Sequence, residues 1–197
     1  MKKQILITIG REYGSGGHDL AVLLSQRLGI RMLDRELIDE LWKNDPEMQR
    51  LAQEYDERPV NRILSRKINE FDNSIPHNVA QRQFDMIRQI ADSGESAIFV
   101  GRCADYVLRD ADVRLLRVFV SAPEEQRIAR KMEQEHLTQP QAVRLLRKMD
   151  KQRRKYYETY THNVWGDSTN YDLCIDTSTC TLDEAAARIA DRFRAMA

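Results

Sequence analysis

The residues with the clearest capacity for chemistry form a glycine-rich turn near the start of the chain. The turn follows an apolar, β-branched run over residues 5–9. Its members are Gly14, Ser15, Gly16, Gly17 and His18. Glycines let backbone N–H groups turn inward around an anion, and a helix that begins directly afterwards aims its positive end at the same point. The order of strand, turn and helix is that of a phosphate-binding loop. A plain glycine turn between a strand and a helix is the alternative.

The turn lacks the lysine that such a loop normally carries. Gly17 stands at the lysine position, and His18 stands where a metal-binding Ser or Thr is expected. Magnesium prefers oxygen ligands, so His18 is predicted either to donate a hydrogen bond to phosphate or to be an ordinary surface histidine. Phosphoryl transfer needs positive charge around the migrating group. Arg11, at the entrance of the turn, is the candidate fixed beside the loop, and Arg127, in a later basic segment, is the candidate delivered by closure of that segment.

A second concentration of candidate residues is a basic segment over residues 127–155. It contains ten Lys and Arg against three Asp and Glu, in a chain whose formal net charge is zero. Charge confined in this way favours a localised anionic partner. Arg127 and Arg130 share a helix face, as do Asp150 and Arg153. Because arginine forks bind phosphate oxygens, the segment is predicted to be a lid that closes over a nucleotide. A solvated helix held by Asp–Arg pairs is the alternative.

The scaffold that positions these residues is predicted to be a parallel sheet wrapped by helices. Short apolar runs indicate strands at residues 5–9, 31–34, 96–100, 115–120 and 173–175. Gly29 is predicted to end the first helix, and Thr181 with Glu184 forms a capping box for the last one. Residues 35–93 are predicted to be a mostly helical insertion, and residues 124–160 a helical lid interrupted near residue 138. The whole chain, 1–197, is predicted to be one α/β domain.

Glycine or polar residues follow all five predicted strands. They are Gly10 and Arg11, Asp34, Gly101 and Arg102, Ser121 and Ala122, and Asp176 and Thr177. Ligands of open parallel sheets bind beyond these carboxyl ends. Asp34 is a candidate to hold magnesium through water or to accept a proton, and the N-cap of the next helix is its alternative role.

Composition bears on the cellular compartment and on the class of binding partner. Three cysteines without metal-ligand spacing fit a reducing cytoplasm. The first apolar run is too short for an export signal, and no later stretch is long enough to span a membrane. Tyr156, Tyr157 and Tyr160 follow helical spacing at the end of the basic segment, which predicts packing and argues against nucleic-acid binding. The sequence does not indicate an oligomeric state.

Together these segments resemble the cytidylate-kinase-like family, a branch of the P-loop nucleoside monophosphate kinases, over nearly the whole chain. The segments that carry the resemblance are residues 10–17, 34–38, 101–108, 122–130, 150–153 and 172–177. The resemblance implies a three-layer fold of the P-loop NTPase type with a helical acceptor-binding insertion and an arginine-rich lid. It also implies ATP and Mg²⁺ as cofactors, and transfer of a phosphoryl group to a nucleotide, with a CMP-like acceptor favoured.

The chemistry of the residues and the resemblance together assign roles to individual residues. Those implied in catalysis are Arg11, Arg127, Arg130 and Asp34. Those implied in ATP binding are Gly14, Ser15, Gly16, Gly17, His18, Asp176 and Thr177. Those implied in acceptor binding are Arg102, Asp105, Asp150 and Arg153.

Three departures from the family pattern leave other functions open. The loop lysine is absent, Cys103 replaces the acid after Gly101 and Arg102, and residues 35–93 contain no cytosine-reading motif. The alternatives are a kinase of a non-nucleotide small metabolite and a degenerate nucleotide-binding protein that acts as a sensor or partner. In each case the predicted partner is a small molecule, with no nucleic acid and no membrane.

Overall fold

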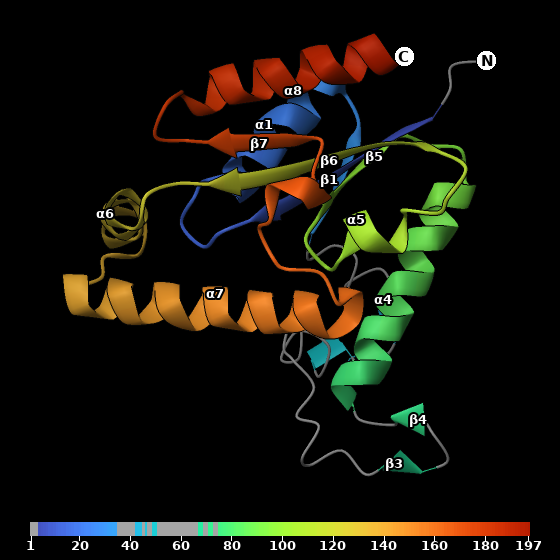
Figure 1. Ribbon diagram of the computed structural model, residues 1–197, viewed down its shortest axis with the longest axis horizontal. Helices are drawn as coiled ribbons and strands as arrows, with labels where there is room; N and C mark the ends of the chain where they lie inside the picture. Colours follow the sequence, from blue (N-terminus) through green and yellow to red (C-terminus); the bar gives the residue numbers. More distant parts are fainter. Residues whose placement is uncertain are drawn as a thin grey trace.

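The centre of the protein is a parallel β-sheet, shown in Figure 1. The computed structural model describes residues 4–34, 42–44, 46, 49–50, 67–68, 71–72 and 75–197. The strands are β1 (Ile5–Arg11), β2 (Arg31–Leu33), β5 (Ala97–Val100), β6 (Arg114–Ser121) and β7 (Leu173–Asp176). They lie in the order β2-β5-β1-β6-β7, and every neighbouring pair is parallel. The predicted five-stranded α/β fold is confirmed.

Helices cover both faces of this sheet (Figure 1). They are α1 (Gly17–Leu28), α4 (Ile75–Asp92), α5 (Ala104–Val107), α6 (Glu124–Glu135), α7 (Gln139–Thr161) and α8 (Leu182–Met196), with a 3-10 turn η1 (Ser168–Asn170). Helices α1 and α8 pack side by side on one face, and α4, α5 and α7 lie on the other side. This gives the predicted three layers.

Local sequence signals set the ends of the helices. Gly29 ends α1 in a left-handed conformation, and its N–H donates to the carbonyl of Ser25. Thr181 and Glu184 form the predicted capping box at the start of α8. A second box, made by Thr138 and Gln141, starts α7 and explains the predicted interruption between the two lid helices.

The two faces of β1 follow the alternation of its side chains. Ile7 and Ile9 point into the core beneath α1 and α8, whereas Leu6 packs into the core beneath α4 and α5. By the same alternation, Thr8 and Gly10 face the side of α5, and Arg11 faces the side of α1. The sequence of β1 therefore delivers different residues to the two sides of its carboxyl end.

The segment between β2 and β5 is described in part. It contains α4 and the antiparallel pair of β3 (Lys67–Ile68) and β4 (Phe71–Asp72). Apart from residues 42–44, 46 and 49–50, the remainder of the predicted helical insertion, including the start of the helix that Asp34 was expected to cap, lies outside the described residues. Among the helices that are described, none has the length and apolar character needed to cross a membrane.

Candidate active site

The glycine turn forms an anion-binding geometry between β1 and α1. Gly14 and Gly16 have φ angles of 78° and 84°, a left-handed backbone that glycine adopts without steric cost. The N–H of Leu20 donates to the carbonyl of Gly16 at 2.9 Å, so the helical hydrogen bonds begin there. The N–H groups of the first turn of α1 have no acceptor within the helix. The loop therefore offers backbone donors and the positive end of a helix to one point.

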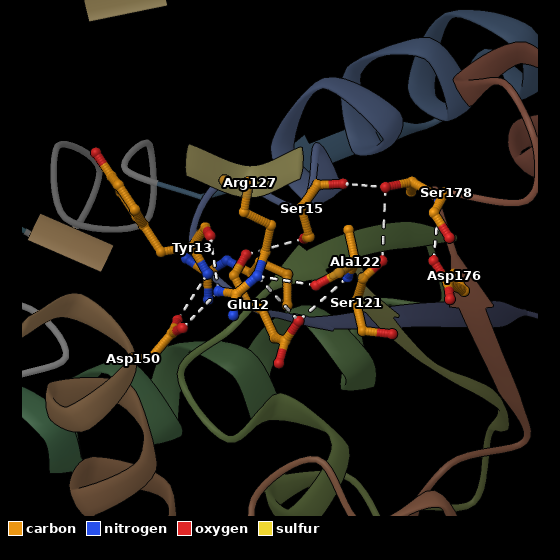
Figure 2. A network of polar contacts seen from close by, with 12 residues as sticks. Glu12, Tyr13, Ser15, Ser121, Ala122, Arg127, Asp150, Asp176 and Ser178 are labelled. Carbon is orange, nitrogen blue, oxygen red and sulfur yellow. Dashed lines mark hydrogen bonds and ion pairs between the residues drawn. The ribbon is translucent and has the colours of Figure 1, made fainter. Parts of the chain in front are cut away.

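Arg127 ties this loop to the lid helices, as Figure 2 shows. Its Nε donates to the carbonyl of Ala122 at 2.9 Å. Its Nη1 donates to the carbonyl of Tyr13 at 3.1 Å and to the carboxylate of Asp150 at 2.6 Å. The same carboxylate accepts the N–H of Tyr13 at 2.7 Å. We call Glu12, Tyr13, Arg127 and Asp150 the loop clamp.

Glu12 completes the loop clamp. Its Oε2 accepts the N–H of Ala122 at 3.1 Å and lies 3.4 Å from Nε of Arg127. Burial raises the pKa of Glu12, although the hydrogen bond from Ala122 and the charge of Arg127 oppose that shift. One arginine thus faces two carboxylates. Arg127 was predicted to be delivered by lid closure, but here it already lies against the backbone of the loop. Its catalytic role stays a prediction.

Arg130 also contacts the loop. Its Nη1 donates to the carbonyl of Gly14 at 2.7 Å, and it lies 3.2 Å from the point that a Cβ on Gly16 would occupy. The hydroxyl of Thr177 donates to the carbonyl of Ser15 at 2.8 Å, which ties the loop to the end of β7. The neighbouring Asp176 accepts the N–H of Ser178 (Figure 2). The side chains of Arg130 and Thr177 therefore contact the backbone of the loop, and Asp176 lies in the adjacent turn.

Asp34 joins His18 to Arg102 across the ends of β2 and β5. Its Oδ1 accepts from Nη1 of Arg102 at 2.7 Å, and its Oδ2 lies 2.9 Å from Nδ1 of His18. Burial alone would raise the pKa of Asp34, but the hydrogen bond with His18 and the charges of Arg102 and Arg11 hold it well below its usual range. The same hydrogen bond raises the pKa of His18. A carboxylate with so low a pKa is a weak general base, which favours a role in orienting cations.

The turn after β5 holds Arg102 in an unusual backbone conformation. Arg102 and Cys103 have φ angles of 55° and 54°, in the left-handed region that residues with a Cβ seldom adopt. The Arg102 side chain is buried, and its Nη1 also donates to the carbonyl of Val100 at 2.7 Å. Backbone strain of this kind persists only where the surroundings enforce it, and it is concentrated at functional sites.

A pocket opens beyond the carboxyl ends of β1 and β5, on the side of α5 and α7. Its charged and aromatic lining consists of Arg11, Arg102, Asp105, Arg153, Tyr156, Tyr157, Trp165 and Tyr171. Gly10 makes room for the aromatic wall, because a Cβ there would lie 2.8 Å from Cδ2 of Phe119 and 3.3 Å from the hydroxyl oxygen of Tyr171. Arginine forks beside flat rings suit a ligand that carries both an anionic group and a ring.

A hydrogen bond between Tyr157 and Asp105 lies in the wall of this pocket. The Tyr157 hydroxyl donates to Oδ2 of Asp105 at 2.7 Å. Burial raises the pKa of Asp105, and it also raises the pKa of Tyr157 and of Tyr171. The hydroxyl of Thr8, also on the pocket side, is buried and finds no hydrogen-bond partner within the described part of the chain.

The structure brings some of the predicted site residues together and separates others. Arg11, Arg102, Asp105 and Arg153 border one pocket, whereas Asp150 lies in the loop clamp. Sequence reasoning gave no site role to several residues that the structure places at the site: Glu12, Tyr13, Trp165, Tyr171 and Tyr157, for which it predicted packing. Glu12 and Tyr13 could have been found, because an acid and an aromatic residue are unusual inside a glycine-rich loop. Nothing in the sequence distinguished the other three from core aromatics.

Comparison with known proteins identifies a matching family and a similar solved structure. The cytidylate kinase-like family matches residues 6–179. An uncharacterized protein from Eubacterium ventriosum ATCC 27560 is 32% identical, with a TM-score of 0.75 over 96% of this chain and 98% of the other. No curated protein matches the chain.

More distant solved structures share the fold. Shikimate kinase from Bacteroides thetaiotaomicron is 12% identical, with a TM-score of 0.58 over 96% of this chain and 98% of the other. APS kinase from Mycobacterium tuberculosis, in complex with AMPPNP and APS, is 16% identical, with a TM-score of 0.55 over 98% of each chain. The predicted P-loop kinase fold is therefore confirmed.

Proposed function

This chain belongs to the cytidylate kinase-like family, and we propose that it transfers the γ-phosphoryl group of ATP to a nucleotide, with a CMP-like acceptor favoured. The observation that carries the proposal is the pocket beside the phosphate loop. Arg11, Arg102 and Arg153 border it together with four aromatic rings. A nucleotide has the two features that such a lining recognises, a phosphate and a flat base.

The donor phosphates would lie on the loop between β1 and α1. The N–H groups at the start of α1 would bind phosphate oxygens, and Arg130 beside Gly14 would add positive charge. Magnesium, supplied with ATP, would neutralise negative charge on the phosphates as that charge develops. Because both oxygens of Asp34 already face Arg102 and His18, this carboxylate fits a water-mediated contact to the ion.

The acceptor would occupy the pocket with its phosphate toward Arg102 and Arg153. Its base would stack among Tyr156, Trp165 and Tyr171. In the reaction, an oxygen of the acceptor phosphate forms a bond to the γ-phosphorus while the bond from that phosphorus to the β-phosphate oxygen breaks, and ADP leaves. The contribution of the protein to such a step is position and positive charge.

ADP release, measured in a coupled assay, tests this function. ATP would be supplied with CMP, dCMP, UMP or AMP, and in parallel with shikimate, APS or gluconate. We expect turnover that depends on a nucleotide and is greatest with CMP or dCMP. If no nucleotide supports turnover, the proposal is wrong. Turnover with one of the other acceptors would then support a metabolite kinase, and tight ATP binding without turnover would support a sensor.

A pair of variants locates the acceptor site. Arg153→Leu removes a cation that borders the pocket and should raise the acceptor KM at least about 10-fold, because a charge-assisted hydrogen bond to phosphate is lost. ATP affinity should change little. Arg147→Leu is the matched control, since Arg147 lies on the same helix, has a 72% exposed side chain and pairs with Glu124. An equal effect of the two changes would place the acceptor elsewhere.

A further inference from the structure

Gly17, at the position of the missing lysine, is pressed against Arg11. A Cβ on Gly17 would lie 2.6 Å from Cβ and 3.1 Å from Cγ of Arg11, and 3.4 Å from Cβ of Val120. Carbon atoms in contact prefer about 3.5–4.0 Å. Gly17 is the first residue of α1 and is not among the glycines with a positive φ angle. The need for glycine here comes from its neighbour, since the backbone conformation suits any residue.

The position of that neighbour is fixed by the sheet. Arg11 is the last residue of β1 and pairs with Val120 of β6. It follows Ile9 by two residues, so its side chain leaves the sheet on the face covered by α1. The clash therefore involves a Cβ atom whose place is set by strand pairing, and rotation of the Arg11 side chain cannot relieve it. A side chain at position 17 and a Cβ at position 11 exclude each other.

The charge of Arg11 acts on Asp34, at the carboxyl end of β2 beside the loop where phosphate is expected. Arg11 is 8% exposed and borders the acceptor pocket. Burial raises the pKa of Asp34, and the charge of Arg11 is one of the influences that lower it, so the guanidinium acts on the carboxylate at the end of β2. The Arg11 side chain thus lies against Gly17 at the end of the loop, and its charge acts on Asp34.

We propose that Arg11 and Gly17 form an exchange pair, in which Arg11 contributes the positive charge that a lysine at position 17 would otherwise bring to the phosphates of a nucleoside triphosphate. Gly17 is the partner of this exchange because its missing side chain leaves the space that Arg11 occupies. The proposal rests on the proposed function. Arg11 would contact the phosphates, and its Cβ leaves no room for a lysine side chain at position 17.

Removal of the charge is the first test. Arg11→Met keeps the Cβ and an unbranched side chain in the same space but has no charge. We expect ATP affinity, measured with a fluorescent ATP analogue, to fall at least about 10-fold, and turnover to fall about 100-fold, as when one charge-stabilising donor is lost from an active site. Arg11→Lys should retain more of both. If Arg11→Met binds ATP like the unchanged protein, Arg11 is not the cation.

The exchange itself is tested with two double variants. Gly17→Lys alone should lower the melting temperature, because the 2.6 Å contact remains. In Arg11→Gly/Gly17→Lys the obstructing Cβ is gone, and ATP affinity should recover at least about 10-fold relative to Arg11→Gly alone. In Arg11→Ala/Gly17→Lys the Cβ is still present, so recovery should fail. Equal recovery in both double variants would overturn the proposal.

The readouts keep this proposal distinguishable from the proposed function. ATP affinity and melting temperature need no acceptor, so both can be measured even if every acceptor in the turnover assay is inactive. Loss of ATP affinity in Arg11→Met without turnover by the unchanged protein would support the exchange pair and contradict the kinase. Acceptor-dependent turnover by the unchanged protein, with an ATP affinity of Arg11→Met equal to that of the unchanged protein, would support the kinase and contradict the exchange pair.

Discussion

The carboxylate of Asp150 lies 2.6 Å from Nη1 of Arg127, and both residues also hold the backbone of Tyr13. Asp150 accepts the N–H of Tyr13 and Arg127 donates to its carbonyl. Arg127 belongs to α6 and Asp150 to α7, so a pair formed between the two lid helices holds both backbone groups of one loop residue (Figure 2). A change in the lid therefore reaches the phosphate loop directly.

Loss of the Asp150 charge should destabilise the protein. The side chains of Arg127 and Asp150 are 9% and 17% exposed, so Asp150→Asn leaves a largely buried guanidinium with Glu12 as its remaining anionic partner. We expect the free energy of unfolding in urea to fall by about 3 kcal/mol. The affinity for ATP should fall as well, because a neutral amide would hold the N–H of Tyr13 less firmly than the carboxylate does.

An exposed pair of the same kind provides the control. Asp191 and Arg194 form an ion pair at 3.0 Å, with side chains 74% and 59% exposed. Asp191→Asn should change the free energy of unfolding by less than about 0.5 kcal/mol, because surface pairs contribute little. If Asp150→Asn and Asp191→Asn lose similar amounts of unfolding free energy, the loop clamp contributes no more to stability than an exposed ion pair.

Gly14 and Gly29 separate the effect of backbone strain from the effect of crowding. Both have positive φ angles, 78° and 65°. A Cβ on Gly14 would lie 3.0 Å from the carbonyl oxygen of Arg127, whereas a Cβ on Gly29 would meet nothing within 4 Å. Gly29→Ala should therefore cost about 1 kcal/mol of stability and leave ATP affinity unchanged. Gly14→Ala should also displace Arg127 and weaken ATP binding at least about 10-fold.

Unfolding in urea and titration with a fluorescent ATP analogue measure both outcomes. Gly29→Ala reports what a left-handed alanine costs by itself. An ATP affinity of Gly14→Ala equal to that of Gly29→Ala would mean that the contact between the loop and α6 has no bearing on phosphate binding.

The sheet was predictable because each strand leaves its own mark on the sequence. Strands buried on both faces appear as short continuous apolar runs, as at residues 5–9 and 96–100. Their boundaries were less visible. Strand β1 continues to Arg11, because pairing with β6 extends as far as Val120 even though Gly10 interrupts the apolar run. That extension is what fixes the place of Arg11.

Contacts between distant elements set the limit of sequence reasoning at the site. The spacing of Asp150 and Arg153 predicted a shared helix face, but it gave no sign that the carboxylate would pair with Arg127, 23 residues earlier. That pair depends on how α6 packs against α7, and local periodicity carries no information about such packing. The hydrogen bond of Tyr157 to Asp105, 52 residues away, was hidden for the same reason.

The contact between His18 and Asp34 should make stability depend on pH. The hydrogen bond to Asp34 raises the pKa of His18 above its ordinary value of 6.5. Stabilisation by protonated His18 is therefore complete below pH 6.5 and is lost as the pH rises through the folded-state pKa. Asp34 has a lowered pKa, so its contribution is present above about pH 4 and is lost at lower pH. The pair should stabilise most between these limits.

Melting temperatures measured between pH 5.5 and pH 8.5 test this window. His18→Asn should remove the part of the slope due to this pair. The effect should stay below about 1 kcal/mol, because the His18 side chain is 57% exposed. Asp34→Asn should flatten most of the same part of the curve, since the histidine loses the carboxylate that raises its pKa most and keeps only the weaker influence of Asp19. An unchanged slope in His18→Asn would assign the pH dependence to other groups.

Thr177 should support nucleotide binding through the loop without touching the acceptor. Its buried hydroxyl donates to the carbonyl of Ser15 at 2.8 Å. Thr177→Val has the same shape but no donor, so the carbonyl of Ser15 loses its partner at a cost of about 1–3 kcal/mol. We expect weaker ATP binding with little change in the acceptor KM. Thr177→Ser keeps the hydroxyl and should bind ATP nearly as well as the unchanged protein. If Thr177→Val also binds ATP normally, the contacts of Arg130 and the loop clamp suffice to shape the loop, and Thr177 serves stability alone.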